Sequence, residues 1–598
     1  GRQTMQTIVK KLIPTWTDGL RPVQEDLVAP ILDGEDILCC TATGDGKSAA
    51  FSIPILILNE YNKNQQLYPA GLRTRLNPVG LVIMPTKGLA SNIVLELIKL
   101  GVSAFSYCHE SLAEARRAGI DLAGVIKRCE TYQVVCVDPE HLRGKEWREI
   151  SDFPVFRARI FYAATDEVHL INEWGFDFRP DFKLIGLFVR GRLPSTISVV
   201  GLSATLTPGP ATTAVCETLG LYENRFHLIR RTNERPNVQF IMKVLGHGLS
   251  GYSFPDILPI LNSGRKAVIH CPTLDMVFRL YVFIWRCQSS TADKARRTRM
   301  YTSLCPAKYN EETLRLLDED PYCQIVIATI AFSNGINARR LLDSISLGFW
   351  STVDILWQDQ GRVGRMLEST ARGIVFVQSA SVKAATKQIA NPTTAPVSKS
   401  KKTKGSRKAG TAAPMDPMKA RMLTETSCYN ALVNDYYGNP PLETTTLDCV
   451  AANRPLPCSN CISRSKKNLV FASPPGTPSF ETLALPVAPA RARSTFPMPP
   501  PKKKKLTKKE RKSAEAALID YRKTLCEEQH LLGNYTEHPI SLFLPSSLQT
   551  LILDKFLTIE SSSAFDLLLS TWRHRELHTR TLFKLVTELQ STINEDRE

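Results

Sequence analysis

The sequence lacks any run of 18 or more uninterrupted apolar residues, the length that a membrane-spanning helix requires. Even the apolar stretch at residues 51–58 is short and contains Ser52 and Pro54. The region after Gly1 also lacks the charged, then apolar, then small-residue pattern of a secretory signal. We therefore expect an intracellular protein without a membrane segment, whose first residue is that of a fragment or a processed chain.

Acidic side chains are scarce in one part of the chain. The formal net charge is +17, and residues 379–512 contain 24 Lys or Arg but only seven Asp or Glu. A polycationic segment of this kind attracts phosphate backbones through counterion release. Nucleic acid is the expected partner, with an acidic protein or a membrane surface as the less specific alternative.

The composition is otherwise that of a globular protein, with 43% apolar and 22% charged residues over 598 positions. This excludes a wholly disordered or fibrous chain and predicts three or four structural units. The chain has 15 cysteines, and Cys39, Cys40, Cys136 and Cys271 lie in apolar runs typical of buried strands. We expect these to be reduced core thiols rather than disulfides.

Residues 35–378 alternate short β-rich apolar runs with helical stretches, which predicts two doubly wound α/β domains with parallel sheets. The expected strands are 36–40, 80–84, 133–137, 158–163 and 197–202, followed by 267–270, 324–328, 344–347 and 373–377.

The first expected strand runs into the sequence TATGDGKS at residues 41–48, and a helical stretch follows. This is the context of a P-loop, in which backbone N–H groups converge on phosphate at a helix N-terminus. Thr43, Gly44, Asp45 and Gly46 form the loop, Lys47 can reach the β and γ phosphates, and Ser48 can bind Mg²⁺. An ordinary glycine turn before a helix is the alternative.

A second acidic element follows the expected strand 158–163, where Asp166 and Glu167 stand side by side. Asp166 is suited to hold Mg²⁺, and Glu167 to orient or deprotonate an attacking water. Taken alone, the pair would be a solvated strand end, but the P-loop upstream favours ATP hydrolysis.

At this point the chain resembles a superfamily-2 helicase of the DEAD/DEAH-like type, and within that class the RecQ family of DNA helicases, over residues 19–378. The resemblance implies two tandem RecA-like domains that bind ATP and Mg²⁺ between them. It also implies that Arg21 stacks on adenine and Gln24 hydrogen-bonds its edge. Pro85, Thr86, Ser203 and Thr205 match motifs that contact the nucleic-acid backbone or link hydrolysis to strand movement.

Two motifs of the second domain complete this resemblance. Residues 328–337, with Thr329 and Asn337, resemble the motif that couples nucleotide to DNA. Residues 358–365 resemble the arginine-finger motif, in which Gln358 positions water and Arg362 and Arg365 stabilise the transition state.

The RecQ assignment depends chiefly on the sequence LINEWGFDFRP at residues 170–180. It is similar to the family's aromatic-rich loop, which senses single-stranded DNA. Trp174 and Phe178 can stack on bases, and Arg179 can pair with phosphate. Departures from the family at Val168, Phe176, residues 333–334 and Met366 bear on rate and coupling rather than on ATP binding.

Cys428, Cys449, Cys458 and Cys461 lie where RecQ proteins carry a four-cysteine zinc module, and the last two have C-x-x-C spacing. The gap between Cys449 and Cys458 is longer than in the family, so unligated thiols in a loop are the alternative. The expected units are a first helicase domain (1–220), a second (221–378), a basic flexible linker (379–425), a zinc module (426–462), a Pro/Lys-rich disordered segment (463–512) and a helical tail (513–598).

The leading hypothesis is an ATP-dependent DNA helicase that moves 3′ to 5′ on single-stranded or forked DNA in repair or recombination. Two alternatives remain: an RNA helicase of the same superfamily, and a nucleic-acid-binding scaffold whose core no longer cycles. Residues 502–505, all lysine, favour a nuclear location. The helical tail is a candidate site for a protein partner.

Overall fold

The computed structural model describes residues 1–69, 74–174, 179–289, 293–329, 332, 338–349, 352–366, 368–391, 415–440, 446–485, 506–531, 540, 543–570, 572 and 574–596. These residues form two compact units, Gly1–Val487 and Ala488–Glu598. The first unit contains both α/β domains, here called the first and second lobes, and the cysteine module.

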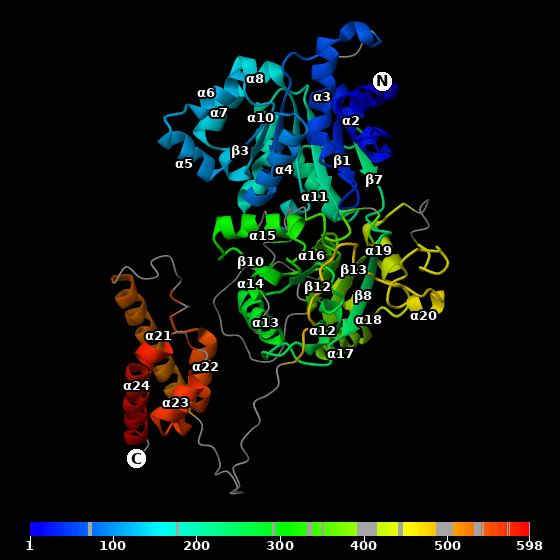
Figure 1. Cartoon of the computed structure of the whole chain (residues 1–598). Helices are drawn as coiled ribbons and strands as arrows, with labels where there is room; N and C mark the ends of the chain where they lie inside the picture. The colour runs from blue at the N-terminus through cyan, green and yellow to red at the C-terminus, as the bar shows by residue number, and fades with distance from the viewer. Residues whose placement is uncertain are drawn as a thin grey trace. The chain divides into compact units, whose positions relative to one another are not determined.

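In the described residues, the first lobe has a parallel seven-stranded sheet with the order β3-β4-β2-β5-β6-β1-β7. Helices cover both faces of this sheet (Figure 1), so its strands are apolar on both sides. In β1, Ile37 and Cys39 pack into one core while Leu38 and Cys40 pack into the other. The strands are β1 (Asp36–Cys40), β2 (Val79–Ile83), β3 (Ala104–Tyr107), β4 (Val134–Val137), β5 (Ile160–Thr165), β6 (Ser198–Ser203) and β7 (Phe226–Arg230).

The helices of the first lobe connect these strands and lie against the two faces of the sheet. They are α1 (Arg2–Leu12), α2 (Pro22–Asp33), α3 (Ala49–Lys63), η1 (Gln65–Leu67), α4 (Lys87–Lys99), α5 (His109–Arg117), α6 (Leu122–Arg128), η2 (Pro139–His141), α7 (Lys145–Asp152), α8 (Pro154–Arg159), α9 (Leu170–Trp174), η3 (Pro180–Leu184), α10 (Ile185–Arg192) and α11 (Pro210–Leu219).

The second lobe has a parallel sheet of six described strands in the order β10-β11-β9-β12-β13-β8. The predicted α/β class with two doubly wound parallel sheets is therefore confirmed. The strands are β8 (Val238–Val244), β9 (Ala267–His270), β10 (Thr298–Tyr301), β11 (Ile325–Ala328), β12 (Asp343–Leu347) and β13 (Ala371–Val377), and the helices are η4 (Pro255–Ile257), α12 (Leu258–Leu261), α13 (Leu274–Cys287), α14 (Lys294–Arg297), α15 (Ala307–Glu319) and α16 (Val353–Gln360).

The boundary between the lobes differs from the predicted one at residues 220/221. Strand β7 pairs with β1 and so belongs to the first sheet, which places the boundary after Arg230. Strand β7 escaped prediction because it is an edge strand whose sequence, FHLIR, mixes polar and apolar residues and contains no buried residue.

The segment predicted as a flexible linker, 379–425, is helical at both ends. Helices α17 (Ser379–Ala390) and α18 (Pro417–Thr424) pack together, and Ala385 and Met418 join a core beside the second sheet. Their alanines and methionines form a small apolar face that the lysine- and threonine-rich composition hid. Residues 392–414 lie outside the described residues.

The beginning of the segment predicted as disordered, 463–512, is also structured. After α20 (Ile462–Ser465), residues 466–485, here called the strap, run along the second lobe without a helix or a strand. Arg265 donates to the carbonyl of Ala472 at 2.8 Å, and Arg297 donates to that of Glu481 at 3.0 Å. Leu483 is buried in the core of the second lobe. The strap has no helix or strand periodicity, so its order depends on these tertiary contacts.

The second unit is helical, as predicted for residues 513–598, although its first helix begins earlier. Its elements are α21 (Lys508–Leu531), α22 (Ser546–Lys555), η8 (Phe556–Thr558), α23 (Ser562–Leu568) and α24 (Arg575–Glu595). They enclose a core of their own that includes Leu518, Phe543, Phe565 and Leu582. None of the helices in the described parts of the chain is long and apolar enough to cross a membrane.

All 15 cysteines are free thiols, and Cys39, Cys40, Cys136 and Cys271 are buried. Burial raises the pKa of Cys39 to about 12. The predicted burial of these four cysteines is therefore confirmed, and their reduced state stays a prediction.

Candidate nucleotide and nucleic-acid sites

The P-loop leaves the carboxyl end of β1 and enters α3. Gly44 and Gly46 have φ angles of +91° and +82°, which other residues rarely adopt, so the glycines are needed for this loop. Lys47 Nζ donates to the carbonyls of Thr41 and Ala42, each at 2.9 Å. Ser48 occupies the N-cap position of α3, with no side-chain capping bond. The loop thus has the form required to hold phosphate, and Lys47 is folded back onto it.

The two residues predicted to read adenine lie directly against this loop. Arg21 caps the start of α2, and its Nη1 donates to the Gly44 carbonyl at 3.3 Å. Gln24 Nε2 lies 3.4 Å from the Gly46 carbonyl. A base held by Arg21 and Gln24 would therefore place its phosphates over the P-loop.

The acidic pair stands at the end of β5, in the sheet that also carries the P-loop. Glu167 has a φ of +50°, and its backbone N–H donates to Asp166 Oδ1 at 2.9 Å. Burial raises the pKa of Asp166 well above its ordinary value, and the adjacent Glu167 carboxylate adds to the effect, while Lys47 opposes it. A buried carboxylate whose negative charge is this poorly compensated fits a divalent cation. Ser48 and Asp166 are the residues that would hold Mg²⁺.

The Glu167 side chain is suited to act as a base. Its Oε2 is buried and accepts no hydrogen bond from the described residues, although His169 Nδ1 lies 3.5 Å away. An acceptor oxygen without a protein donor can take a hydrogen bond from water.

Side chains from both lobes meet beside this pair. Gln358, in α16 of the second lobe, lies 2.7 Å from His169 Nε2 and donates to Thr205 Oγ1 at 3.0 Å. The other ring nitrogen of His169 lies 3.0 Å from Ser203 Oγ. The predicted water-positioning residue Gln358 is thus engaged with two elements of the first lobe, and Ser203 and Thr205 belong to the same network.

The two predicted finger arginines follow α16. Arg362 is 3% exposed, and burial lowers its pKa, whereas Glu167, Asp359 and Asp166 oppose that shift. Burial also lowers the pKa of Arg365 to about 9, and the positive charges of Arg362 and Arg235 add to the shift. The arginines therefore lie in one electrostatic environment with the carboxylates of the opposite lobe.

Arg179 is paired with protein groups. It forms a two-bond ion pair with Glu140, at 2.5 and 2.6 Å, and also donates to the Pro85 carbonyl. Thr86 caps α4, since its Oγ1 accepts from Leu89 N at 3.4 Å. The predicted phosphate contact by Arg179 requires this ion pair to open.

Other predicted nucleic-acid residues are only partly described. Thr329 follows β11, and its backbone N–H lies 3.4 Å from the Tyr301 carbonyl. Trp174 ends α9, but its side chain, Phe178 and Asn337 lie outside the described residues.

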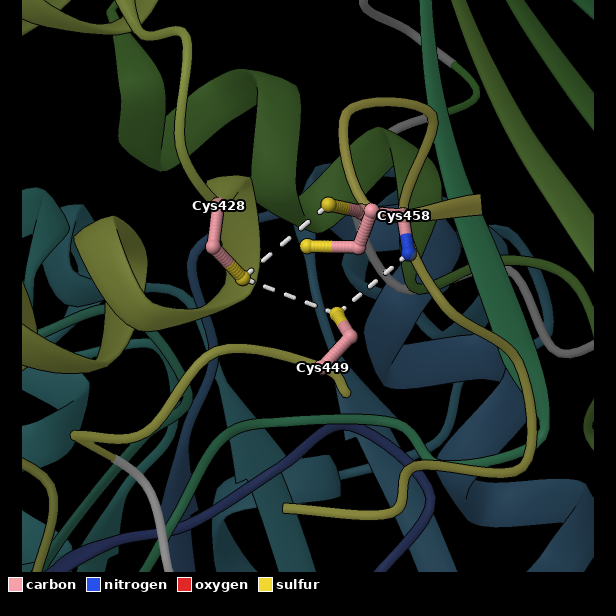
Figure 2. A group of neighbouring side chains, drawn as sticks. Cys428, Cys449 and Cys458 are labelled. Atoms are coloured by element: carbon pink, nitrogen blue, oxygen red, sulfur yellow. Dashed lines mark hydrogen bonds between the residues drawn. The ribbon is translucent and has the colours of Figure 1, made fainter. Parts of the chain in front are cut away.

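The four cysteines of the module converge. Their sulfur atoms all lie within 4.8 Å of one another, and each residue is buried. Figure 2 shows three of the side chains pointing toward a common centre, with Cys428 Sγ 3.5 Å from that of Cys449 and 4.0 Å from that of Cys458. Sulfurs bound to a tetrahedral zinc at about 2.3 Å would lie roughly 3.8 Å apart. The spacing fits zinc despite the long gap between Cys449 and Cys458.

Donors surround these sulfurs as well. The backbone N–H groups of Ala431 and Cys458 donate to the sulfurs of Cys428 and Cys449, at 3.4 and 3.3 Å (the second bond is drawn in Figure 2). Arg464 donates to Cys461 Sγ at 3.1 Å. Such donors stabilise thiolates, the form that binds metal. The module also includes α19 (Tyr429–Tyr437), whose Tyr437 hydroxyl donates to Asp354 of the second lobe at 2.8 Å.

The sequence alone did not single out Arg235, Asn237 or the ion pair between Glu234 and Arg454. Arg235 contacts loops of both lobes, and Asn237 donates to the Gly364 carbonyl at 2.8 Å. The available signal was the sequence ERPN at residues 234–237, where a proline stiffens a charged turn between two sheets.

The sequence profile of DEAD/DEAH box helicases matches residues 21–213. ATP-dependent DNA helicase RecQ of Haemophilus influenzae is 24% identical, over 60% of this chain and 51% of the relative. ATP-dependent DNA helicase Q1 of Pongo abelii is also 24% identical, over 58% and 48%. A protein of Acanthamoeba polyphaga mimivirus named as an ATP-dependent RNA helicase is 26% identical, over 58% and 56%. The chain thus spans about half the length of these relatives.

Among solved structures, the DUF1998 helicase MrfA bound to DNA and AMPPNP has a TM-score of 0.50 with this chain. It is 16% identical, and the match covers 65% of this chain and 52% of that one, which is a likeness of fold. The matched profile shows a DEAD/DEAH box helicase domain at residues 21–213, and the similarity to relatives named RecQ or Q1, at 24% identity, supports a RecQ-like superfamily-2 helicase.

Proposed function

We propose that the chain is an ATP-dependent DNA helicase of RecQ type, which moves 3′ to 5′ on single-stranded or forked DNA during repair or recombination. The observation that carries the proposal is the meeting of Gln358 with His169 and Thr205, because it joins a motif of the second lobe to the acidic motif of the first. The direction of movement and the DNA substrate are supported by the relatives named RecQ.

Each cleft residue has a separate role in ATP hydrolysis. Lys47 exchanges its bonds to the loop carbonyls for bonds to phosphate, and Glu167 accepts a proton from the attacking water. Arg362 and Arg365 neutralise the charge that develops on the transferring phosphoryl group. Mg²⁺, when bound, supplies further positive charge to the phosphate oxygens.

Movement follows from the contacts between lobes. Ser203 and Thr205 link the acidic motif to Gln358, so opening of the cleft after hydrolysis must break bonds that closure makes. Closure and opening would shift the second lobe along a bound strand. Thr86, Arg179 and Thr329 are the described candidates for strand contacts.

The decisive experiment measures steady-state ATP hydrolysis by the purified chain with and without single-stranded DNA. We expect strong stimulation by DNA and a loss of at least 100-fold in Glu167→Gln, because the base can no longer accept the proton. Lys47→Ala should also abolish hydrolysis. Tight DNA binding without any hydrolysis would contradict the proposal and favour the nucleic-acid-binding scaffold.

An RNA helicase is the second candidate, supported by the mimivirus relative named as an RNA helicase. Matched single-stranded DNA and RNA of one sequence separate the two, because only RNA carries the 2′-hydroxyl. If RNA stimulates ATP hydrolysis more than DNA does, RNA becomes the proposed substrate in place of DNA.

We also propose that the cysteine module holds one structural Zn²⁺. Metal analysis should find one zinc per chain, and Cys461→Ser should lose it, whereas Cys323→Ser, at a buried thiol outside the module, should retain it. A full-length, folded chain free of zinc would contradict this proposal.

The lysine tract at residues 502–505 supports a nuclear location, which replacement of the four lysines by alanine should abolish in a fluorescent fusion. The helical second unit is the proposed site for a protein partner.

A further inference from the structure

The chain between the lobes is held from both sides. Residues 231–237, here called the interlobe linker, join β7 of the first sheet to β8 of the second. Asn233 Nδ2 donates to the Ala204 carbonyl at 3.0 Å, and Trp357 Nε1 donates to the Asn233 carbonyl at 3.1 Å. The linker is thus bonded to the Ser203–Thr205 motif in one lobe and to α16 in the other.

One guanidinium group of this linker spans the nucleotide cleft. Arg235 Nη1 donates to the Thr43 carbonyl at 3.0 Å and to that of Gly361 at 3.3 Å. Its Nη2 donates to the carbonyls of Gly364 and Val363, at 2.5 and 3.3 Å. The side chain therefore ties the P-loop to residues 361–364, the loop that carries Arg362 and leads into Arg365.

The charges around Arg235 have the sign expected near a triphosphate. Its positive charge and that of Arg362 both lower the pKa of Arg365, so the three guanidinium groups repel one another. Burial lowers the pKa of Arg235 itself, while Asp45 of the P-loop opposes the shift. An anionic triphosphate in the cleft would relieve this repulsion.

The neighbouring residue anchors the linker to the cysteine module. Glu234 forms an ion pair with Arg454, and the side chains of the two residues are 14% and 7% exposed, respectively. Glu234 Oε2 also accepts a hydrogen bond from Asn434 at 2.8 Å. With Glu234 fixed on one side and Pro236 restricting the backbone on the other, Arg235 has little freedom. Its position is set before nucleotide binds.

We propose that Arg235 is a positioning residue for ATP hydrolysis, which fixes the P-loop against the arginine-finger loop so that Arg362 and Arg365 reach the transferring phosphoryl group. The inference rests on the proposed ATPase function and adds a residue to it. An arginine is required, because its planar fork donates to four carbonyls of two loops, whereas a lysine offers one point charge.

The test compares kcat and KM for ATP, with saturating single-stranded DNA, in Arg235→Ala, Arg235→Lys and the wild type. Misplacement of the finger loop should lower kcat on the order of 10- to 100-fold in both variants. KM should change by less than about threefold, because Lys47 and the P-loop still bind ATP. The matched control is Arg297→Ala, which removes a buried arginine of the second lobe outside the cleft. It should lower the melting temperature and leave kcat within about twofold of the wild type.

A double variant separates positioning from general stability. If Arg235 acts through the finger loop, Arg235→Ala combined with Arg362→Ala should lose little more activity than Arg362→Ala alone. The inference would be overturned if the kcat losses of the two single variants multiplied in the double variant. A rise in KM at constant kcat in Arg235→Ala would also overturn it. If the wild type hydrolyses ATP and Arg235→Ala is equally active, only the inference about Arg235 is overturned. If the wild type is inactive, the proposed function is overturned as well. Arg235→Lys keeps the test decisive if the alanine variant does not fold.

Discussion

At the scale of single residues, polar side chains join separate parts of the first unit. Gln358 reaches His169 and Thr205, and Asp354 accepts from the hydroxyl of Tyr437 in the cysteine module. Gln358 is buried and Asp354 is half-buried, and removal of these groups from water makes each sensitive to the loss of a partner. The carboxylate of Asp354 also makes the stability of the chain depend on pH.

Asp354 gives a specific prediction of this kind. Burial raises its pKa to about 6, although the bond from Tyr437 opposes the shift, so the folded chain holds the proton more tightly than the unfolded chain. Stability from this group is present at low pH and is lost as pH rises from about 4 through 6. Asp354→Asn avoids the loss, and its oxygen can still accept from Tyr437. Relative to wild type, the variant should gain up to about 3 kcal/mol between pH 4 and 7.

Thermal or urea unfolding at pH 5, 6 and 7 measures this difference. Asp435→Asn, at an exposed carboxylate of the module, is the control and should show no such trend. A constant difference between Asp354→Asn and wild type over this range would contradict the raised pKa.

At the scale of elements, the strap contributes buried surface to a lobe from which it is distant in sequence. Leu483 is 2% exposed, and its backbone N–H and carbonyl both bond the side chain of Asn262. Arg297 also lies over the ring of Phe480, at 4.7 Å from its centroid. The strap is therefore part of the second lobe rather than a tether.

Leu483→Ala should accordingly destabilise the second lobe by about 2–4 kcal/mol, the usual result of truncating a buried leucine. Leu485, two residues later, is 53% exposed, and Leu485→Ala should change stability by less than about 0.5 kcal/mol. Chemical denaturation of the two variants gives the comparison. Equal, small effects would mean that the strap does not pack on the lobe in solution.

The elements also show where sequence reasoning reaches its limit. Central strands such as β1 and β9 were predicted to the residue, because strands buried on both faces are continuous apolar runs. The strap and β7 were missed, because partners distant in sequence hold them in place. The same holds in the cleft. The glycines of the P-loop and the acidic pair could be predicted from their spacing in the sequence, whereas Arg235 bonds to backbone carbonyl groups, which leave no pattern in the sequence.

At the scale of the whole molecule, the chain consists of two units with separate cores. Trp572 is the single tryptophan after residue 487, it is 5% exposed, and its Nε1 donates to the Phe543 carbonyl at 2.7 Å. We expect a fragment of residues 500–598 to unfold cooperatively in urea, with a red shift of the Trp572 emission. A gradual shift without a transition would show that the unit needs the rest of the chain to fold.

The strap also affects synthesis of the chain on the ribosome. The last strand of the second sheet, β13, ends at Val377, but the core of that lobe is completed only by Leu483. Part of the apolar surface of the lobe therefore stays exposed while residues 378–482, which include the cysteine module, are translated. Folding of this lobe is thus coupled to a later part of the nascent chain, and a ribosome stalled before residue 483 would present an incomplete lobe to chaperones.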